Sequence, residues 1–257
     1  MNEQILTTPA VATAEALLKE CWATRSIGAI IGANGSGKTF ALRALELRYP
    51  KLGLPGTCLR YRCCQLQGVT RGVRDVLLHL GGRLASLRSG ATGGLQLFSK
   101  MAKTEFTKRD IQTLLLDEAD LWDIGALSGL VTFYDLMADA GHPLVLIITG
   151  IAPSAQWLDQ LSSLRSRTLR IEMVPPLSKE LLLAVLQEWA QPFRNLAEKV
   201  NGGIAASEKL LKRIERGTEG NLRRARQFTD LLLMAGPDFS LTEESVAAAF
   251  AKMLQNV

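Results

Sequence analysis

Residues 27–39, IGAIIGANGSGKT, constrain the fold of this chain more than any other stretch. An apolar run ends at Gly32 and opens into a glycine-rich turn that closes on Lys38 and Thr39, which fits G-x-x-x-x-G-K-[ST] at every position. Glycines allow successive backbone N–H groups to turn inward around a phosphate. The helical spacing of apolar residues after Thr39 predicts a helix whose N-terminus adds its dipole to this cradle. The order of strand, loop and helix is typical of an α/β fold.

The side chains of this loop favour a polyphosphate together with a magnesium ion. The Lys38 ammonium can reach the β- and γ-phosphates, and the Thr39 hydroxyl can ligate Mg²⁺. A glycine-rich turn that binds nothing is the alternative, but the motif and its flanking pattern agree with each other. We therefore expect the bound nucleotide to contact Gly32, Ala33, Asn34, Gly35, Ser36, Gly37, Lys38, Thr39 and Phe40.

Two carboxylates follow another apolar run, IQTLLLDEADLW at residues 111–122. A run without alternation is typical of a strand buried on both faces of a parallel sheet. Carboxylates at its C-terminal end would lie at the sheet edge where α/β proteins bind ligands. Asp117 can help to hold Mg²⁺, and Glu118 can polarise a water molecule for attack on the γ-phosphate. The pair predicts a hydrolase.

Further polar residues near strand ends are candidates for the same site. Thr149 ends an apolar run and can hydrogen-bond the γ-phosphate or the attacking water, although it can also be an ordinary strand-ending threonine. Arg165 and Arg167 precede a short strand, and Arg223 begins a C-terminal helix. An arginine aimed at the γ-phosphate stabilises charge in the transition state. The alternative for these arginines is a surface position at a helix end.

The best boundary in the chain is the Pro-Pro pair at residues 175–176, after which the apolar pattern is helical throughout. Ser240 and Glu243 are spaced as a capping box for the last helix. With 257 residues, of which 47% are hydrophobic, the chain has ample material for a core. The predicted parts are a lead-in helix over 1–25, an α/β core with a parallel sheet between helices over 26–174, and a helical lid over 175–257.

Composition indicates the cellular compartment of the protein and the state of its cysteines. No run approaches the length of a membrane span, and the N-terminus lacks the layout of a secretory signal, so we expect a soluble protein of the cytoplasm. The cysteines form no C-x-x-C pair and have no histidine pair at zinc spacing, which favours reduced structural thiols over a metal site. They are Cys21, Cys58, Cys63 and Cys64.

Positive charge is concentrated between Arg60 and Arg109. This segment has ten bases and two acids and so carries +8, which leaves −3 for the remainder of a chain whose net charge is +5. Such a segment is the footprint of a nucleic-acid surface, although a solvated face or a surface for an acidic protein has the same composition. Residues 83–110 look like a surface excursion between two core strands. We expect its main DNA contacts at Lys100, Lys103, Lys108 and Arg109.

The motifs GANGSGKT, LLLDEAD, LRSRT and GNLRR, in this order and before a helical C-terminal region, resemble the AAA+ ATPases. The resemblance covers residues 26–257 and implies that ATP and Mg²⁺ are the cofactors. It makes Lys38 and Thr39 the Walker A residues and Asp117 and Glu118 the Walker B pair. Thr149 would then be sensor 1.

The same resemblance assigns roles to the arginines. Arg223, in G-x-x-R, matches sensor 2. The arginine finger that completes the site of a neighbouring subunit would be Arg167, with Arg165 as second choice. A homo-oligomer is therefore implied.

Among AAA+ proteins, the compact size, basic segment and short lid are similar to the transposition regulators of the TnsC, TniB and MuB type, most of all to minimal TnsC proteins of CRISPR-associated transposons. This similarity implies a ring or helical filament on double-stranded DNA that recruits a transposase, with a targeting protein as a further partner. ATP hydrolysis would time disassembly. One alternative is a helicase or clamp-loader type of ATPase that acts on another ring protein. A small-molecule kinase with the same loop is another.

Overall fold

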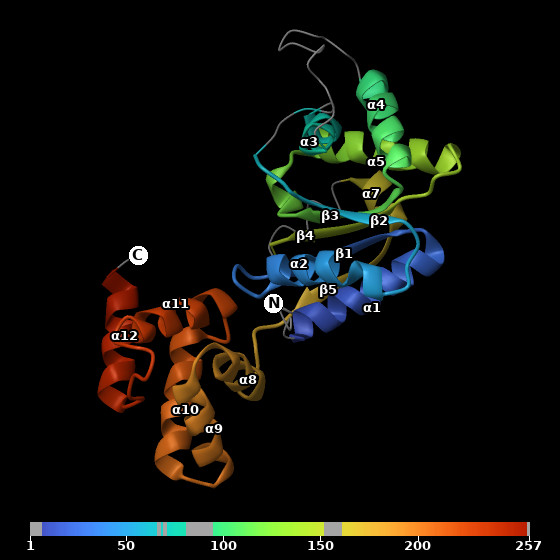
Figure 1. The fold of residues 1–257 in the computed structure, drawn as a ribbon. Coiled ribbons are helices and arrows are strands. Elements are labelled where there is room, and N and C mark those ends of the chain that lie inside the picture. The colour runs from blue at the N-terminus through green and yellow to red at the C-terminus, as the bar shows by residue number, and fades with distance from the viewer. Residues whose placement is uncertain (1–6, 66–67, 69–70, 81–94, 152–160, 256–257) are drawn as a thin grey trace. The chain divides into compact units, whose positions relative to one another are not determined.

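The computed structural model describes residues 7–65, 68, 71–80, 95–151 and 161–255 (Figure 1). The chain separates into two compact units. We call Ala10–Gly32 with Lys38–Val174 the sheet unit, and Ala33–Gly37 with Pro175–Val257, grouped with the N-terminal residues up to Pro9, the helical unit.

Five parallel strands form the centre of the sheet unit, in the order β2-β3-β4-β1-β5. Every residue of β1 and β4 is buried, and β3 is buried except at Gln112. These are the strands that the continuous apolar runs predicted, and the α/β fold with a parallel sheet is confirmed. The strands are β1 Ile27–Gly32, β2 Thr57–Arg62, β3 Ile111–Asp117, β4 Val145–Gly150 and β5 Thr168–Val174.

Helices cover both faces of this sheet (Figure 1). One face carries α1 Pro9–Thr24 and α2 Lys38–Arg48, and the other carries α3 Arg71–His79, α4 Leu95–Lys108, α5 Ile124–Asp139 and α7 Ser162–Arg167. Two short 3₁₀ helices, η1 Tyr49–Lys51 and η3 Ala119–Leu121, follow α2 and β3.

Helix α1 is packed tightly onto the sheet. A Cβ added at Gly28 in β1 would lie 2.8 Å from Leu17 and 2.9 Å from the Cys21 sulfur, so α1 approaches the strand where a side chain is missing. The indole N–H of Trp22 donates to the Thr113 hydroxyl at 2.9 Å, which ties the end of α1 to β3. Helix α1 is therefore packed into the core of the sheet unit.

Helix α4 differs from the expected surface excursion. Phe98, Ala102 and Phe106, spaced four residues apart, are buried and belong to the core formed with α3, α5 and the sheet. The basic residues of this helix predicted a surface position, but its apolar stripe packs into the core and only its outer face is basic. The first part of the predicted excursion, residues 83–94, lies outside the described residues.

The helical unit has its own hydrophobic core, which includes Phe193, Phe228 and Phe239. Ser178 caps α8 by accepting a hydrogen bond from the Leu181 N–H at 3.4 Å. None of the helices in the described ranges combines the length and apolar character needed to cross a membrane. The helices are α8 Lys179–Trp189, α9 Gln191–Asn201, α10 Ala205–Thr218, α11 Leu222–Leu233 and α12 Glu243–Gln255.

The predicted capping box of the last helix is shifted by two residues. Thr242 and Ser245 cap reciprocally: each hydroxyl accepts a hydrogen bond from the other residue's backbone N–H, at 3.1 and 2.9 Å. Ser240 contributes only its carbonyl, which accepts from the Ser245 hydroxyl. A serine in the place of the usual Glu or Gln performs the second half of the box.

Candidate nucleotide-binding site

The glycine-rich turn between β1 and α2 has the backbone geometry of a phosphate cradle. Gly35 and Gly37 have φ values of 79° and 100°, a region that side chains disfavour. The Ser36 hydroxyl is buried without a hydrogen-bond partner among the described residues. Lys38 is buried at the start of α2, and its Nζ donates to the Gly32 carbonyl at 2.7 Å. The loop thus has a charged amine and an unsatisfied hydroxyl suited to a phosphate.

Residues 33–37 of this turn belong to the helical unit. Within that unit, the Asn221 side-chain amide donates to the Asn34 carbonyl, and the Leu222 N–H donates to the Gly35 carbonyl at 2.8 Å. Asn221 also caps α11 by accepting hydrogen bonds from the N–H groups of Arg223 and Arg224. The Asn221 side chain therefore both caps the N-terminus of α11 and forms a hydrogen bond to the glycine-rich turn.

Asp117 is the centre of a polar network at the C-terminal edge of the sheet. Strand β4 lies between β3 and β1, so Thr149 at the end of β4 is beside the carboxylate that ends β3. Asp117 is fully buried, and its Oδ1 accepts hydrogen bonds from the hydroxyls of Thr149 at 2.9 Å and Thr39 at 3.2 Å. The Thr149 hydroxyl in turn accepts from the Glu118 N–H at 3.1 Å. The structure brings together these four residues that the sequence placed in one site.

The donor set fits a magnesium ion. The second carboxylate oxygen of Asp117, Oδ2, is buried and has no hydrogen-bond partner among the described residues. With the Thr39 hydroxyl, it offers the hard oxygen ligands that Mg²⁺ prefers. Mg²⁺ usually keeps several waters and takes one or two protein oxygens plus substrate phosphates, so a small set suffices.

Arg62 is a site residue that the sequence reasoning missed. The Arg62 Nε donates a hydrogen bond to Oε2 of Glu118 at 2.8 Å, and Nη2 donates to Oε1 at 3.2 Å. Both carboxylate oxygens of Glu118 therefore accept a hydrogen bond from Arg62. The parallel register pairs Arg62 at the end of β2 with Asp117 at the end of β3. Only the strand order reveals this neighbour. Glu118 itself has φ 60° and ψ 43°, a left-handed conformation rare for a side-chain-bearing residue.

Asp120 is a second residue that was not assigned, although the DEAD sequence contains it. Burial raises its pKa, and the positive charge of Lys38 acts in the opposite direction. Its Oδ1 is buried without a hydrogen-bond partner in the described part of the chain. Asp120 therefore adds a third carboxyl group to the site that contains Asp117 and Glu118, whose charges act on it.

The two candidates for the arginine finger lie at the N-terminal end of strand β5, opposite to the strand ends that carry Asp117 and Thr149. Arg165 and Arg167 end α7 immediately before β5 begins, whereas Gly32 pairs with Val174 at the far end of that strand. A strand of this length spans roughly 20 Å, so Arg167 is remote from its own phosphate loop. Its guanidinium makes a two-point ion pair with Asp135 at 2.7 and 2.8 Å.

The remaining predicted residues are distributed over other elements. Arg223 is exposed near the start of α11, in the helical unit. Lys100 and Lys108 are exposed on α4, Lys103 is half-buried, and Arg109 pairs with Glu105 at 3.3 Å. Phe40 is half-buried in the first turn of α2.

Comparison with known families gives the class of the protein. Residues 22–158 match the AAA domain family. The match covers more than half of the chain, and the chain therefore belongs to this family. Among curated proteins, none matches the sequence significantly.

Solved structures show the same fold. The ORC2 protein of Aeropyrum pernix in ADPNP and ADP complexes aligns with a TM-score of 0.65 at 15% identity, over 95% of this chain and 66% of that chain, just under two thirds of its length. The A. pernix ORC1 protein in complex with DNA aligns at 0.63 and 16% identity, over 98% and 68%. Domain III of the Thermotoga maritima replication initiation protein DnaA aligns at 0.56 and 15% identity, over 96% and 93%.

Proposed function

We propose that this protein is an ATPase. The observation that carries the proposal is the buried Asp117 carboxylate, which is shared by Thr39 and Thr149 and has one oxygen left unsatisfied. The turn and Lys38 bind and orient the phosphates, and Thr39 and Asp117 would hold Mg²⁺, whose positive charge would offset the negative charge of the phosphates. Glu118 accepts a proton from the attacking water once Arg62 releases its carboxylate. Thr149 orients the Glu118 backbone through its hydroxyl.

We further propose that the ATPase is a DNA-binding regulator of transposition that forms an oligomer on duplex DNA. The concentrated positive charge and the lysines on the outer face of α4 support DNA binding. The position of Arg167, a strand length from its own phosphate loop, supports an oligomer in which it serves a neighbour. The transposase and the targeting protein as partners are expectations from the resemblance to TnsC-type regulators.

Electron microscopy of the protein with duplex DNA and a non-hydrolysable ATP analogue tests this proposal. A continuous filament or a stack of rings on DNA is expected, and its absence with both DNA and nucleotide present would contradict the proposal. The alternative, an ATPase acting on another ring protein, is supported by the fold shared with domain III of the replication initiation protein DnaA. A discrete complex with a helicase, without a DNA filament, would support that alternative.

DNA binding is expected to be strongly weakened by salt and tolerant of sequence, because lysines on one helix face contact phosphates rather than base edges. Replacing Lys100 and Lys103 with alanine should reduce the slope of log affinity against log salt by about 1.8 per protomer, at about 0.9 per lost contact. Fluorescence anisotropy of labelled duplex DNA over a salt series measures the slope.

The matched control is the pair Lys179→Ala and Lys252→Ala, which removes two lysines from helices of the other unit. It should leave the slope unchanged. If the α4 variant kept the wild-type slope, the DNA surface would have to be placed elsewhere on the chain.

A further inference from the structure

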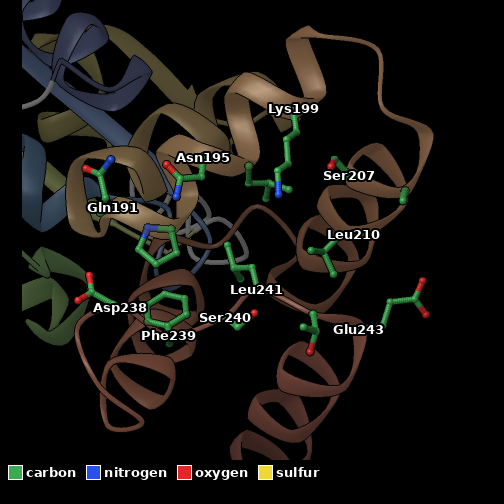
Figure 2. Close-up of a pocket in the computed structure, with 14 residues that line it drawn as sticks. Gln191, Asn195, Lys199, Ser207, Leu210, Asp238, Phe239, Ser240, Leu241 and Glu243 are labelled. Carbon is green, nitrogen blue, oxygen red and sulfur yellow. The ribbon is translucent and has the colours of Figure 1, made fainter.

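Two adjoining hollows lie in the helical unit, and no residue of the phosphate loop lines either of them. The first, of about 420 Å³, is bounded by α9, α10 and the segment Asp238–Thr242 (Figure 2). The second, of about 360 Å³, follows α10. Both are lined by Leu210 and Glu243, so they are neighbours. We call them together the α10 groove.

The first hollow has an apolar floor and an amide-bearing edge. Leu196, Leu210 and Phe239 are buried beneath it. Gln191 and Asn195, one turn apart on α9, stand along its edge (Figure 2). An apolar floor beside amide side chains suits an apolar peptide side chain whose backbone is hydrogen-bonded at the rim.

The second hollow is lined by a basic stripe on α10. Lys209, Lys212, Arg213 and Arg216 recur at i, i+3, i+4 and i+7, which places all four on one helix face over about 10 Å. All four are exposed. Within the described ranges, Lys212 and Arg216 have no ion-pair partner. The stripe therefore presents two positive charges, beside the first hollow, that are not neutralised by an ion pair in the described residues.

One carboxylate of the protein already occupies part of this stripe. Glu243 lies 3.0 Å from Lys209 and 3.9 Å from Arg213. The hydrogen bond and charge of Lys209 hold the pKa of Glu243 below its usual range, so Glu243 is ionised at neutral pH. The contacts of Glu243 show that this face of α10 binds a carboxylate. Lys212 and Arg216, towards the other end of the stripe, can bind a carboxylate of another molecule.

We infer that the α10 groove is a docking site for an acidic peptide segment of a partner protein, with an apolar side chain in the first hollow and carboxylates on Lys212 and Arg216. A peptide fits better than nucleic acid because Phe239, the aromatic residue that lines the first hollow, is buried beneath it and offers no exposed face for a stacked base. This inference does not depend on the proposed role in transposition.

Selection of random dodecapeptides on the immobilised full-length chain, followed by anisotropy of the enriched peptides, tests the inference. The enriched peptides should combine acidic residues with an apolar residue. Their affinity should fall about ten-fold or more for Lys212→Glu with Arg216→Glu, since two attractive exposed pairs become repulsive. The control, Lys179→Glu with Lys252→Glu, makes the same change in net charge outside both hollows and should bind like wild type.

A second variant has the opposite expected effect. Glu243→Gln removes the internal competitor and releases Lys209, so the same peptides should bind a few-fold tighter. Unchanged ATP turnover and an unchanged melting curve establish that each variant is folded.

The inference would be overturned by enrichment of peptides without acidic residues, by equal affinities of the groove and control variants, or by weaker binding to Glu243→Gln. A parallel measurement determines the affinity of the same variants for labelled duplex DNA. If the groove variant lost DNA affinity while peptide binding stayed at the wild-type level, the groove would be a nucleic-acid surface instead.

Discussion

Replacing Arg167 with alanine should lower ATP turnover by roughly 10³- to 10⁵-fold while ATP binding stays near wild type, because an arginine finger acts on charge that develops in the transition state. Arg167 precedes β5, at the opposite end of that strand from the phosphate loop of its own chain. In the proposed oligomer, the site that Arg167 can serve is therefore that of a neighbouring subunit. Turnover and the affinity for a fluorescent ATP analogue are to be measured over a range of protein concentrations.

The ion pair with Asp135 requires a control. Asp135→Asn breaks the same pair but leaves the guanidinium in place, so a purely structural role predicts equal losses for the two variants. The finger role predicts that Asp135→Asn retains most of the turnover. The pair must open if Arg167 reaches across to a neighbour, and a modest gain in Asp135→Asn would agree with that.

Mixing provides the decisive evidence on Arg167. Arg167→Ala and Lys38→Ala are each expected to be inactive, but the intact Arg167 of the second protein can serve the intact phosphate loop of the first. Partial recovery of turnover on mixing is the expected result, after sedimentation has shown that the two proteins co-assemble. Co-assembly without recovery would exclude the assignment of Arg167 to a neighbour's site and direct attention to Arg165.

Glu118→Gln should lower ATP turnover by roughly 10²- to 10⁴-fold, the usual contribution of a general base, and leave ATP binding intact. Glutamine keeps the shape of the side chain, and the backbone N–H that donates to Thr149 is unchanged. If hydrolysis times disassembly, complexes of this variant should persist on DNA. A dissociation assay compares their lifetimes with wild type, and equal lifetimes would contradict the timing role.

Arg62→Ala supplies the complementary change. Arg62 holds both oxygens of Glu118 in an ion pair whose arginine side chain is 64% exposed. Exposed pairs are worth at most about 1 kcal/mol, so freeing the carboxylate should raise turnover without DNA by no more than about five-fold. A fall in turnover would mean that Arg62 contributes to catalysis.

Part of the candidate site was predictable because its residues are encoded in short contiguous stretches. The turn that ends at Thr39 and the acid pair at Asp117 each carry their own spacing rule. Thr149 was assigned from the resemblance and its position at a strand end, and its contact with Asp117 required β4 to lie between β3 and β1.

Contacts that depend on tertiary neighbours were not predictable. Arg62 looked like one of ten bases in a charged segment, and only the pairing of β2 with β3 places it beside Glu118. Asp135 gave no sign of its partnership with Arg167 because the two are 32 residues apart on different helices.

The parallel strands have a consequence for symmetry. If each chain receives an arginine at the C-terminal edge of its sheet and donates one from the N-terminal edge, its two contact surfaces differ, and subunits join head to tail. Any open row then ends in one subunit whose site has no donor, and only a closed ring completes every site. Turnover per subunit should therefore be lowest in the shortest rows and approach a constant value as they grow.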